Sequence, residues 1–313
     1  MNNFLDALPL QPKTSPAGSI IRLILVLILG MFVAQFIAAI TVLPIVGFNI
    51  KEFEAALSNP ADHPKGQMVL IVSQAVSSIF TFIIFPIAYL RMGEKQQFSQ
   101  LSPVWRMEIQ DVLAVVIIMI SFLIVDARII LWNESITFPE SLRGLEEMMR
   151  GMEDKLAASM ETLTKIESPV TFIILLFVMA VVPGIGEELV FRGLLQNYLH
   201  RLTKNPHIAI WVAALIFSGI HLQFYGFVPR VLLGALFGYL YVITGRLSVA
   251  MFAHFVNNAL TLLGVYLQQT GAIEGDTNTP EKMPWGTTIV AGMVFIAVMM
   301  LYYSYQNKRK LSE

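Results

Sequence analysis

The sequence predicts an all-α protein that crosses the membrane several times as a bundle of about eight helices. Hydrophobic residues make up 56% of its 313 residues and charged residues only 14%, and its mean hydropathy is +0.66. Soluble domains carry about 25% charged residues. In addition, uncharged runs of about the length that a helix needs to cross a bilayer recur along the whole chain. These two observations exclude a soluble globular protein and a disordered one.

Each expected span is an uncharged apolar run. The first run follows roughly 20 residues that contain several polar residues and prolines, and it is too long for a signal peptide, so we expect it to remain as a membrane anchor. The eight runs are Leu23–Val46, Met68–Leu90, Val112–Val125 (extendable to Trp132), Pro169–Gly186, Pro206–Ile220, Val231–Thr244, Ser248–Leu267 and Gly286–Tyr305.

Charge and cysteine content exclude several functional classes. The formal net charge is -1, so no overall positive field attracts nucleic acid, and we expect none as a partner. The chain has no cysteine, which excludes disulfides, thiolate metal sites and cysteine nucleophiles. The expected partners are the lipid bilayer and a peptide or protein substrate. The sequence leaves the oligomeric state open.

The distribution of basic residues predicts the orientation. Lys and Arg favour the cytoplasmic loops of membrane proteins, and more than half of the 21 basic residues fall on one side when both termini are placed inside. An even number of spans agrees with this placement. We therefore expect a multi-pass protein of the bacterial inner membrane with both termini in the cytoplasm.

The segment 126–168 is the longest piece expected outside the membrane. Leu and Met recur within it every three or four residues, which predicts an amphipathic helix. Its polar residues include more acids than bases, so we expect it to pack over the bundle, as a lid for example, rather than to bind anionic lipid. Asp126 and Arg128 are interpreted as charges that reach the membrane interface from the end of the third span.

Ionisable residues within membrane spans are costly and are functional-site hypotheses by default. Here they gather in the C-terminal half of the chain, in motifs whose polar members are four residues apart. The three motifs contain Glu187, Glu188 and Arg192; Phe217 and His221; and His254 and Asn258.

The spacing of four places both members of a pair on one helix face. Glu188 and Arg192 can therefore neutralise each other within one helix, whereas Glu187 points about 100° away and needs another partner. Phe217 is interpreted as packing around His221. His254 and Asn258 present an imidazole and a carboxamide to whatever lies opposite.

A turn at Asn205-Pro206 is expected to bring the first two motifs together. Glu187 lies 18 residues before Asn205 and His221 lies 15 residues after Pro206, so an antiparallel hairpin places both at similar depth. His254 lies shallower unless the helices tilt. One carboxylate, two imidazoles and one carboxamide are thus expected to converge on a single cavity.

Such a set suits amide hydrolysis. A glutamate shielded from bulk water can act as general base on a water molecule that a histidine orients. A second histidine and an asparagine can donate hydrogen bonds to the developing oxyanion. Pro183, Gly184 and Gly186 are expected to interrupt the helix just before the glutamates, where backbone bends around a cavity.

These three motifs, in this order, resemble the CPBP family of intramembrane proteases, which includes the CAAX prenyl endoproteases and Abi-type bacteriocin-immunity proteins. The resemblance implies that Glu187 and His221 activate water and that His254 and Asn258 stabilise the oxyanion. It also implies a supporting role for Glu188 and Arg192. The enzyme is then a glutamate-type endopeptidase that needs no cofactor.

The resemblance divides the chain into three parts. Residues 1–168 hold N-terminal membrane helices and the extramembrane segment, residues 169–267 form the protease-like core, and residues 268–313 hold the last membrane helix and a basic tail.

Three alternatives stay open. Glu187, His221 and His254 also form a possible zinc ligand set, which implies a metalloprotease. A non-proteolytic immunity or regulatory protein can use the same scaffold. A transporter also has polar groups at mid-membrane, but the chain shows no paired repeat of broken helices.

Overall fold

The computed structural model describes residues 14–102, 104–273 and 284–312, and within that part the secondary structure is helical, with no strand. Seven of the described helices are long and apolar enough to cross a bilayer, and α11 (Pro206–Gly219) is a shorter apolar helix. The predicted all-α, multi-pass bundle of about eight spans is therefore confirmed. The long spans are α2 (Pro16–Val42), Gly66–Gly93, α6 (Ile109–Glu134), Pro169–Thr203, α12 (Phe227–Thr244), α13 (Leu247–Gln269) and α14 (Trp285–Ser312).

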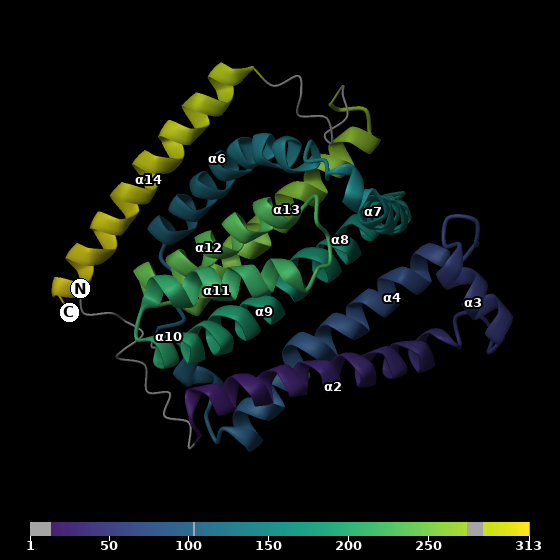
Figure 1. The fold of residues 1–313 in the computed structure, drawn as a ribbon, viewed down its shortest axis with the longest axis horizontal. Coiled ribbons are helices and arrows are strands. Elements are labelled where there is room, and N and C mark those ends of the chain that lie inside the picture. The colour runs from purple at the N-terminus through teal and green to yellow at the C-terminus, as the bar shows by residue number, and fades with distance from the viewer. Residues whose placement is uncertain (1–13, 103, 274–283, 313) are drawn as a thin grey trace.

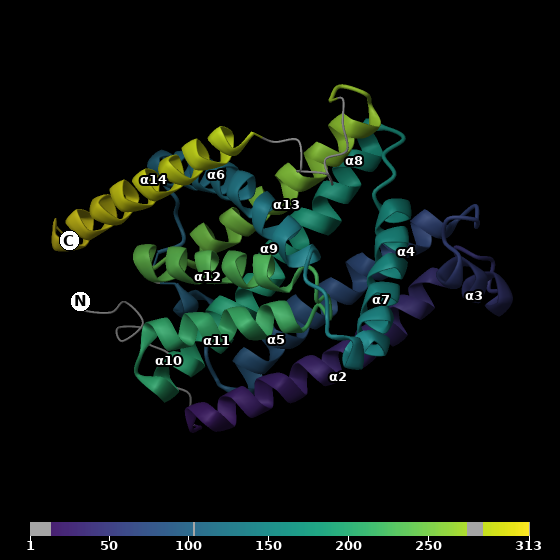
Figure 2. The same cartoon turned by 45° about the horizontal axis from the view of Figure 1, so that its top comes forward.

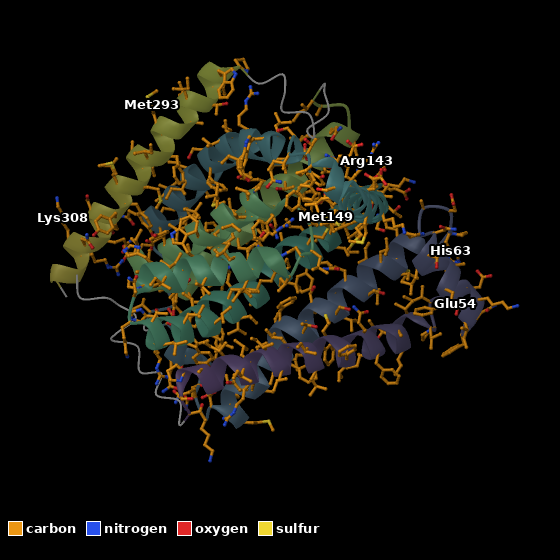
Figure 3. All side chains as sticks on the ribbon, in the orientation of Figure 1. Glu54, His63, Arg143, Met149, Met293 and Lys308 are labelled. Atoms are coloured by element: carbon orange, nitrogen blue, oxygen red, sulfur yellow. The ribbon has the colours of Figure 1, made fainter. Side chains whose placement is uncertain are left out.

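The axes of the long helices lie roughly along one line, with neighbouring helices often antiparallel. The bundle therefore has two ends and an apolar outer surface between them. The beginning of α2 and the end of α14 lie at the same end of the bundle in both views (Figures 1 and 2), as an even number of crossings requires. Glu54 and His63 lie at the opposite end from Lys308, whereas Met293 lies on the outer side of α14 (Figure 3) and is 58% exposed. Polar ends and apolar flanks are what a bilayer demands.

The helix predicted within segment 126–168 is present as α7 (Arg143–Leu163). It is seen end-on in Figure 1 and from the side in Figure 2, so it lies crosswise to the spans at the end away from the beginning of α2 and the end of α14. α6 continues through Asp126 to Glu134, so the connection from the third span to α7 begins later than expected, at Ser135.

The orientation of α7 differs from the expectation that its apolar face packs on the bundle. Five apolar side chains of α7 are between 38% and 56% exposed, namely Leu145, Met148, Met152, Leu156 and Met160. The charged side makes much of the contact, because Glu153 Oε1 accepts a hydrogen bond of 2.8 Å from the backbone N–H of Tyr225. At the end of the helix Leu163 is buried against Leu175 and Leu262. The helix therefore lies over the bundle through polar residues along its length and through one apolar residue at its end.

The predicted turn before α11 is present and has a clear local cause. The preceding helix α10 (Asn197–Thr203) is followed by Lys204, whose φ of 56° is left-handed. Asn205 then caps α11, since its side chain accepts from two backbone N–H groups, and Pro206 occupies the first helical position. This turn sets the antiparallel hairpin that carries Glu187 on one arm and His221 at the end of the other.

The helix is not broken just before the glutamates, contrary to what Pro183, Gly184 and Gly186 predicted. Residues 169–203 form one continuous rod in which α9 (Val182–Glu188) is regular, flanked by π-helical turns η5 (Phe177–Val181) and η6 (Leu189–Gln196). Such turns are frequent at functional sites. A Cβ on Gly184 would lie 3.1 Å from the Phe255 backbone N, and one on Gly186 would lie 2.8 Å from Phe82 Cβ. These glycines serve close packing of neighbouring helices rather than a break.

Candidate active site

Glu188 and Arg192 form the buried ion pair that their spacing predicts. Arg192 Nη1 donates to Glu188 Oε1 at 2.6 Å, and the two side chains are 1% and 0% exposed. Arg192 Nη2 also donates to the carbonyl of Gly234 on α12 at 2.7 Å. The cation is thus held between two helices, and its charge is balanced by Glu188.

His254 links the first and third motifs. Its Nδ1 lies 2.8 Å from Glu188 Oε1, and because a carboxylate only accepts, we assign the proton to Nδ1. Its Nε2 then faces Glu187, with 3.9 Å between Nε2 and Oε2. The predicted shallower position of His254 does not keep it apart from the glutamates.

Glu187 is placed differently from its neighbour. Its side chain is 14% exposed, and no hydrogen bond to its carboxylate is present in the part of the chain that the structure describes. Oε1 of Glu188 accepts from Arg192 and His254, and its Oε2 is buried without a donor among the described residues. The Glu187 carboxylate also keeps free acceptor positions, but it is partly exposed, so of the two adjacent acids Glu187 is the one that a water molecule can reach.

Phe217 is the packing centre of the site, as expected. Its ring meets those of His221 and His254 edge-on, with centroid distances of 5.2 Å and 6.1 Å. The guanidinium of Arg192 lies 4.9 Å from the same centroid. One buried phenyl ring thus fixes the distance between the two imidazoles and seals the ion pair from solvent.

His221 lies just beyond the end of α11, and its Nδ1 is 2.8 Å from the carbonyl oxygen of Phe217. A carbonyl accepts, so Nδ1 carries the proton and Nε2 is left available. His221 interacts electrostatically with His254, but no direct contact with Glu187 occurs among the described hydrogen bonds and ion pairs. A bound water is what would join these two groups.

Asn258 is one turn beyond His254, and its hydrogen bonds lead away from the site. Its Nδ2 donates to the carbonyl of Met179 at 2.9 Å, and its Oδ1 accepts from Asn257 at 3.0 Å. One of its two N–H groups remains available for an oxyanion. His254 can serve as the other donor only when both of its nitrogens carry protons.

The site does not present a ready three-ligand metal centre. Within residues 14–102, 104–273 and 284–312, no group of three His, Asp or Glu side chains is placed to hold a metal ion. Nδ1 of His254 is engaged by Glu188 and Nδ1 of His221 by a carbonyl. A zinc ion would need Nε2 of both histidines and Glu187 to approach one another.

Two charged residues that sequence reasoning did not assign to the site interact with this group. Arg230, near the start of α12, interacts electrostatically with both Glu187 and His221. Asp126 on α6 is only 6% exposed and interacts with Arg230, so it is buried and does not reach the interface as expected. A charged residue within an apolar span is a sign of function that the sequence does show. The sequence does not show which residue it interacts with, because each partner lies on another helix.

The loop that follows His221 is held by α7. The hydroxyl of Tyr225 donates to Glu146 Oε1 at 3.3 Å, and the guanidinium of Arg150 stacks 4.2 Å from the ring centroid of Tyr225. The backbone N–H of Phe138 donates to Glu146, and this bond together with Arg150 lowers the pKa of the Glu146 carboxyl. α7 thus fixes the backbone on which His221 depends.

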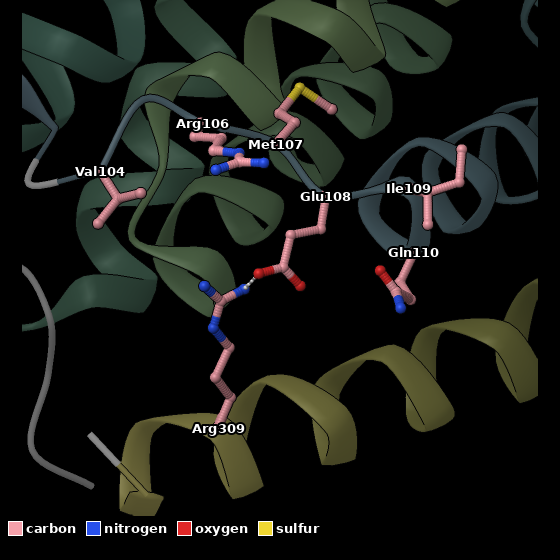
Figure 4. Close-up of a pocket in the computed structure, with 7 residues that line it drawn as sticks. All are labelled: Val104, Arg106, Met107, Glu108, Ile109, Gln110 and Arg309. Carbon is pink, nitrogen blue, oxygen red and sulfur yellow. Dashed lines mark ion pairs between the residues drawn. The ribbon is translucent and has the colours of Figure 1, made fainter.

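A separate pocket lies at the end of the bundle where α14 ends. It has a volume of about 600 Å³ and is lined by Val104, residues 106–110 and Arg309, which pairs with Glu108 at 2.9 Å (Figure 4). None of its lining residues belongs to the three motifs, so this pocket is distinct from the candidate active site.

Comparison with known proteins supports the resemblance. Residues 169–260 match the family described as Type II CAAX prenyl endopeptidase Rce1-like. The chain is also 35% identical over 79 residues to the uncharacterised protein YpbD of Bacillus subtilis strain 168, a match that covers 24% of this chain and 37% of YpbD. The chain therefore spans little more than a third of the curated relative. No solved structure matches the chain.

The family match covers all three motifs. The resemblance to CAAX-type intramembrane proteases is thereby confirmed over the segment that carries Glu187, His221, His254 and Asn258.

Proposed function

We propose that this chain, whose residues 169–260 are of the CAAX prenyl endopeptidase type, is an intramembrane endopeptidase that hydrolyses a peptide bond of a membrane-associated peptide or protein. The observation that carries the proposal is that two adjacent acids, Glu187 and Glu188, have different surroundings. Glu188 is neutralised by Arg192 and accepts a hydrogen bond from His254, while Glu187 faces Nε2 of His254 and has no hydrogen bond among the described residues.

In this proposal Glu187 accepts a proton from a water molecule that His221 orients through Nε2. The hydroxide attacks the carbonyl carbon of the substrate, and the oxyanion that forms accepts hydrogen bonds from Asn258 and from Nε2 of His254, which carries protons on both nitrogens at this step. The proton held by Glu187 then passes to the leaving nitrogen. Placing these groups inside a membrane bundle excludes bulk water, so their electrostatic interactions are stronger than at a surface.

Arg192 and Glu188 support the site in this proposal without touching the substrate. The carboxylate of Glu188 holds a proton on Nδ1 of His254 and fixes the orientation of the ring. The guanidinium of Arg192 in turn neutralises Glu188. A second carboxylate next to Glu187 would repel it, and Arg192 removes most of that repulsion.

We propose that the mechanism is of the glutamate type and needs no metal, with zinc as the alternative that the same three side chains allow. We also place the protein in the bacterial inner membrane with both termini cytoplasmic, and we assign the proteolytic core to residues 169–267. Activity that survives a zinc chelator supports the glutamate mechanism, whereas activity that is lost and returns with added zinc favours the metalloprotease.

The substrate is best sought in cells. Membrane peptides from cells that carry the unaltered protein are compared by mass spectrometry with those from cells that carry Glu187→Ala. Fragments present only with the unaltered protein support the endopeptidase and identify its substrate. Identical peptide profiles at equal protein levels would favour the non-proteolytic immunity or regulatory protein.

A further inference from the structure

Arg230 retains a hydrogen-bond donor that the protein does not use. Its Nη2 donates to Gln223 Oε1 at 2.6 Å, but its Nη1 is buried without an acceptor among the described residues. The other buried cation of the site, Arg192, has acceptors in Glu188 and Gly234. Because burying an unpaired donor costs free energy, an unused N–H beside the candidate active site indicates a missing acceptor.

Asp126, on the neighbouring helix α6, has a hydrogen-bond acceptor that the protein does not use. Its side chain is buried, and its Oδ1 has no donor in the part of the chain that the structure describes. It interacts electrostatically with Arg230, and α6 packs against α12. An unused acceptor and an unused donor of opposite charge therefore lie in the same region.

These two charges differ from the other buried pairs of the molecule. Glu188 meets Arg192 at 2.6 Å, and Arg246 meets Asp111 at 2.5 Å, in direct ion pairs. No hydrogen bond or ion pair of 4.0 Å or less joins Asp126 to Arg230 in the described structure. Opposite charges buried in an apolar bundle gain most by direct contact, so their separation calls for a group between them.

The backbone of a substrate has the chemistry of that group. A trans peptide group presents its C=O and its N–H in opposite directions, so one group can accept from Arg230 and donate to Asp126. A substrate that is extended for cleavage within a membrane has lost the hydrogen bonds of its helix, and each unpaired backbone group is costly there.

We propose that Arg230 and Asp126 form a substrate-binding subsite that holds one backbone peptide group next to the bond being cut. The subsite rests on the proposed endopeptidase function. It recognises backbone rather than a side chain, so it requires an extended segment and tolerates many sequences. Arg230 lies one turn before Gly234 on α12, where the Gly234 carbonyl accepts from Arg192 and a Cβ would lie 3.1 Å from the ring of Phe217, so the subsite lies beside the candidate active site.

Gly226 provides the space for the guanidinium. A Cβ on Gly226 would lie 3.1 Å from Nη2 and 3.4 Å from Nη1 of Arg230. The φ of Gly226 is -107°, so alanine suits the backbone and only the guanidinium has to shift. Gly226→Ala is therefore a mild variant that displaces the donor without removing its charge.

Binding is tested in the Glu187→Gln background, which separates it from cleavage. The probe is a fluorescent farnesylated CAAX peptide, and the readout is its Kd in proteoliposomes. We expect Arg230→Gln and Asp126→Asn each to weaken binding by about tenfold or more, which is typical of hydrogen bonds to charged groups, and Gly226→Ala to weaken it less. Arg143→Gln, which alters an arginine exposed on α7, is the matched control and leaves Kd unchanged.

A change in the peptide tests the same hydrogen bond from the side of the substrate. Amides of the probe are replaced one at a time by esters, which removes one N–H. We expect a single ester position to weaken binding by about tenfold when Asp126 is present, and by less than about threefold in Asp126→Leu. If every position costs the same, or if the penalty at that position persists in Asp126→Leu, the subsite is wrong.

Kinetics with Glu187 intact separate this proposal from a catalytic role and from the proposed function. We expect Arg230→Gln to raise KM about tenfold with kcat little changed. A lower kcat at unchanged KM would overturn the subsite and make Arg230 an oxyanion donor. A probe that the unaltered protein binds but never cuts contradicts the endopeptidase function and leaves the subsite standing, whereas a probe that does not bind overturns the subsite.

Discussion

Removing the carboxylate of Glu188 is expected to destabilise the fold, because this side chain balances a buried charge. Glu188 Oε1 lies 2.6 Å from Nη1 of Arg192 and 2.8 Å from Nδ1 of His254, and the side chains of Glu188 and Arg192 are at most 1% exposed. Breaking a buried pair by removing one partner typically costs about 3–5 kcal/mol. At about 2–4 °C per kcal/mol for a domain of roughly this size, Glu188→Ala should lower Tm by on the order of 10 °C.

The measurement is thermal unfolding of purified protein in detergent, followed by size-exclusion of the heated sample. Glu147→Ala is the matched control, since Glu147 pairs with Arg143 in an ion pair whose side chains are 70% and 72% exposed. Exposed pairs contribute about 0–1 kcal/mol, so Tm should barely move. Glu187→Ala should also lower Tm less than Glu188→Ala does. Equal Tm values for Glu188→Ala and Glu147→Ala would refute the account of the ion pair.

Three further results are expected. Asp111→Asn should loosen α14 and increase hydrogen exchange there, because the Asp111 carboxylate accepts from Arg246 as well as from Tyr302 on α14; unchanged exchange in α14 would contradict this. The lowered pKa of Glu146 contributes stability that is present at neutral pH and is lost as pH falls through its folded-state pKa, below the ordinary glutamate value of about 4.3. Acid should therefore release α7, measured as faster proteolysis, and Glu146→Gln should remove this pH dependence. Reporter fusions at the two termini should lie on the same side of the membrane, and opposite sides would reject the eight-span bundle.

Local spacing predicted the contacts that form within one helix or across one short turn. The pairing of Glu188 with Arg192 follows from four residues of separation, and the hairpin follows from Asn205 as a helix cap before a proline. These features depend on neighbours in the sequence, so they are readable without the fold. The apolar length of each span is a local property in the same sense.

Contacts between distant segments had no such signal. The bond from His254 to Glu188 depends on how α13 crosses the long rod, and the approach of Arg230 to Asp126 depends on the packing of α12 on α6. The sequence pattern of α7 predicted an amphipathic helix but not which face meets the bundle. That choice is made by Tyr225, whose backbone and ring bind the charged side of α7.

The most direct test of the proposed mechanism is the cleavage rate of Glu187→Gln. Glutamine keeps the size and shape of the side chain but cannot take a proton from water. The purified variant in proteoliposomes should stay folded, bind a farnesylated CAAX peptide as the unaltered protein does, and cleave it about 10²–10⁴ times more slowly. His221→Ala should lose a similar factor and Asn258→Ala less, since His254 remains as a donor. A folded Glu187→Gln protein that cleaves the peptide at the unaltered rate would contradict the assignment of Glu187 as the general base.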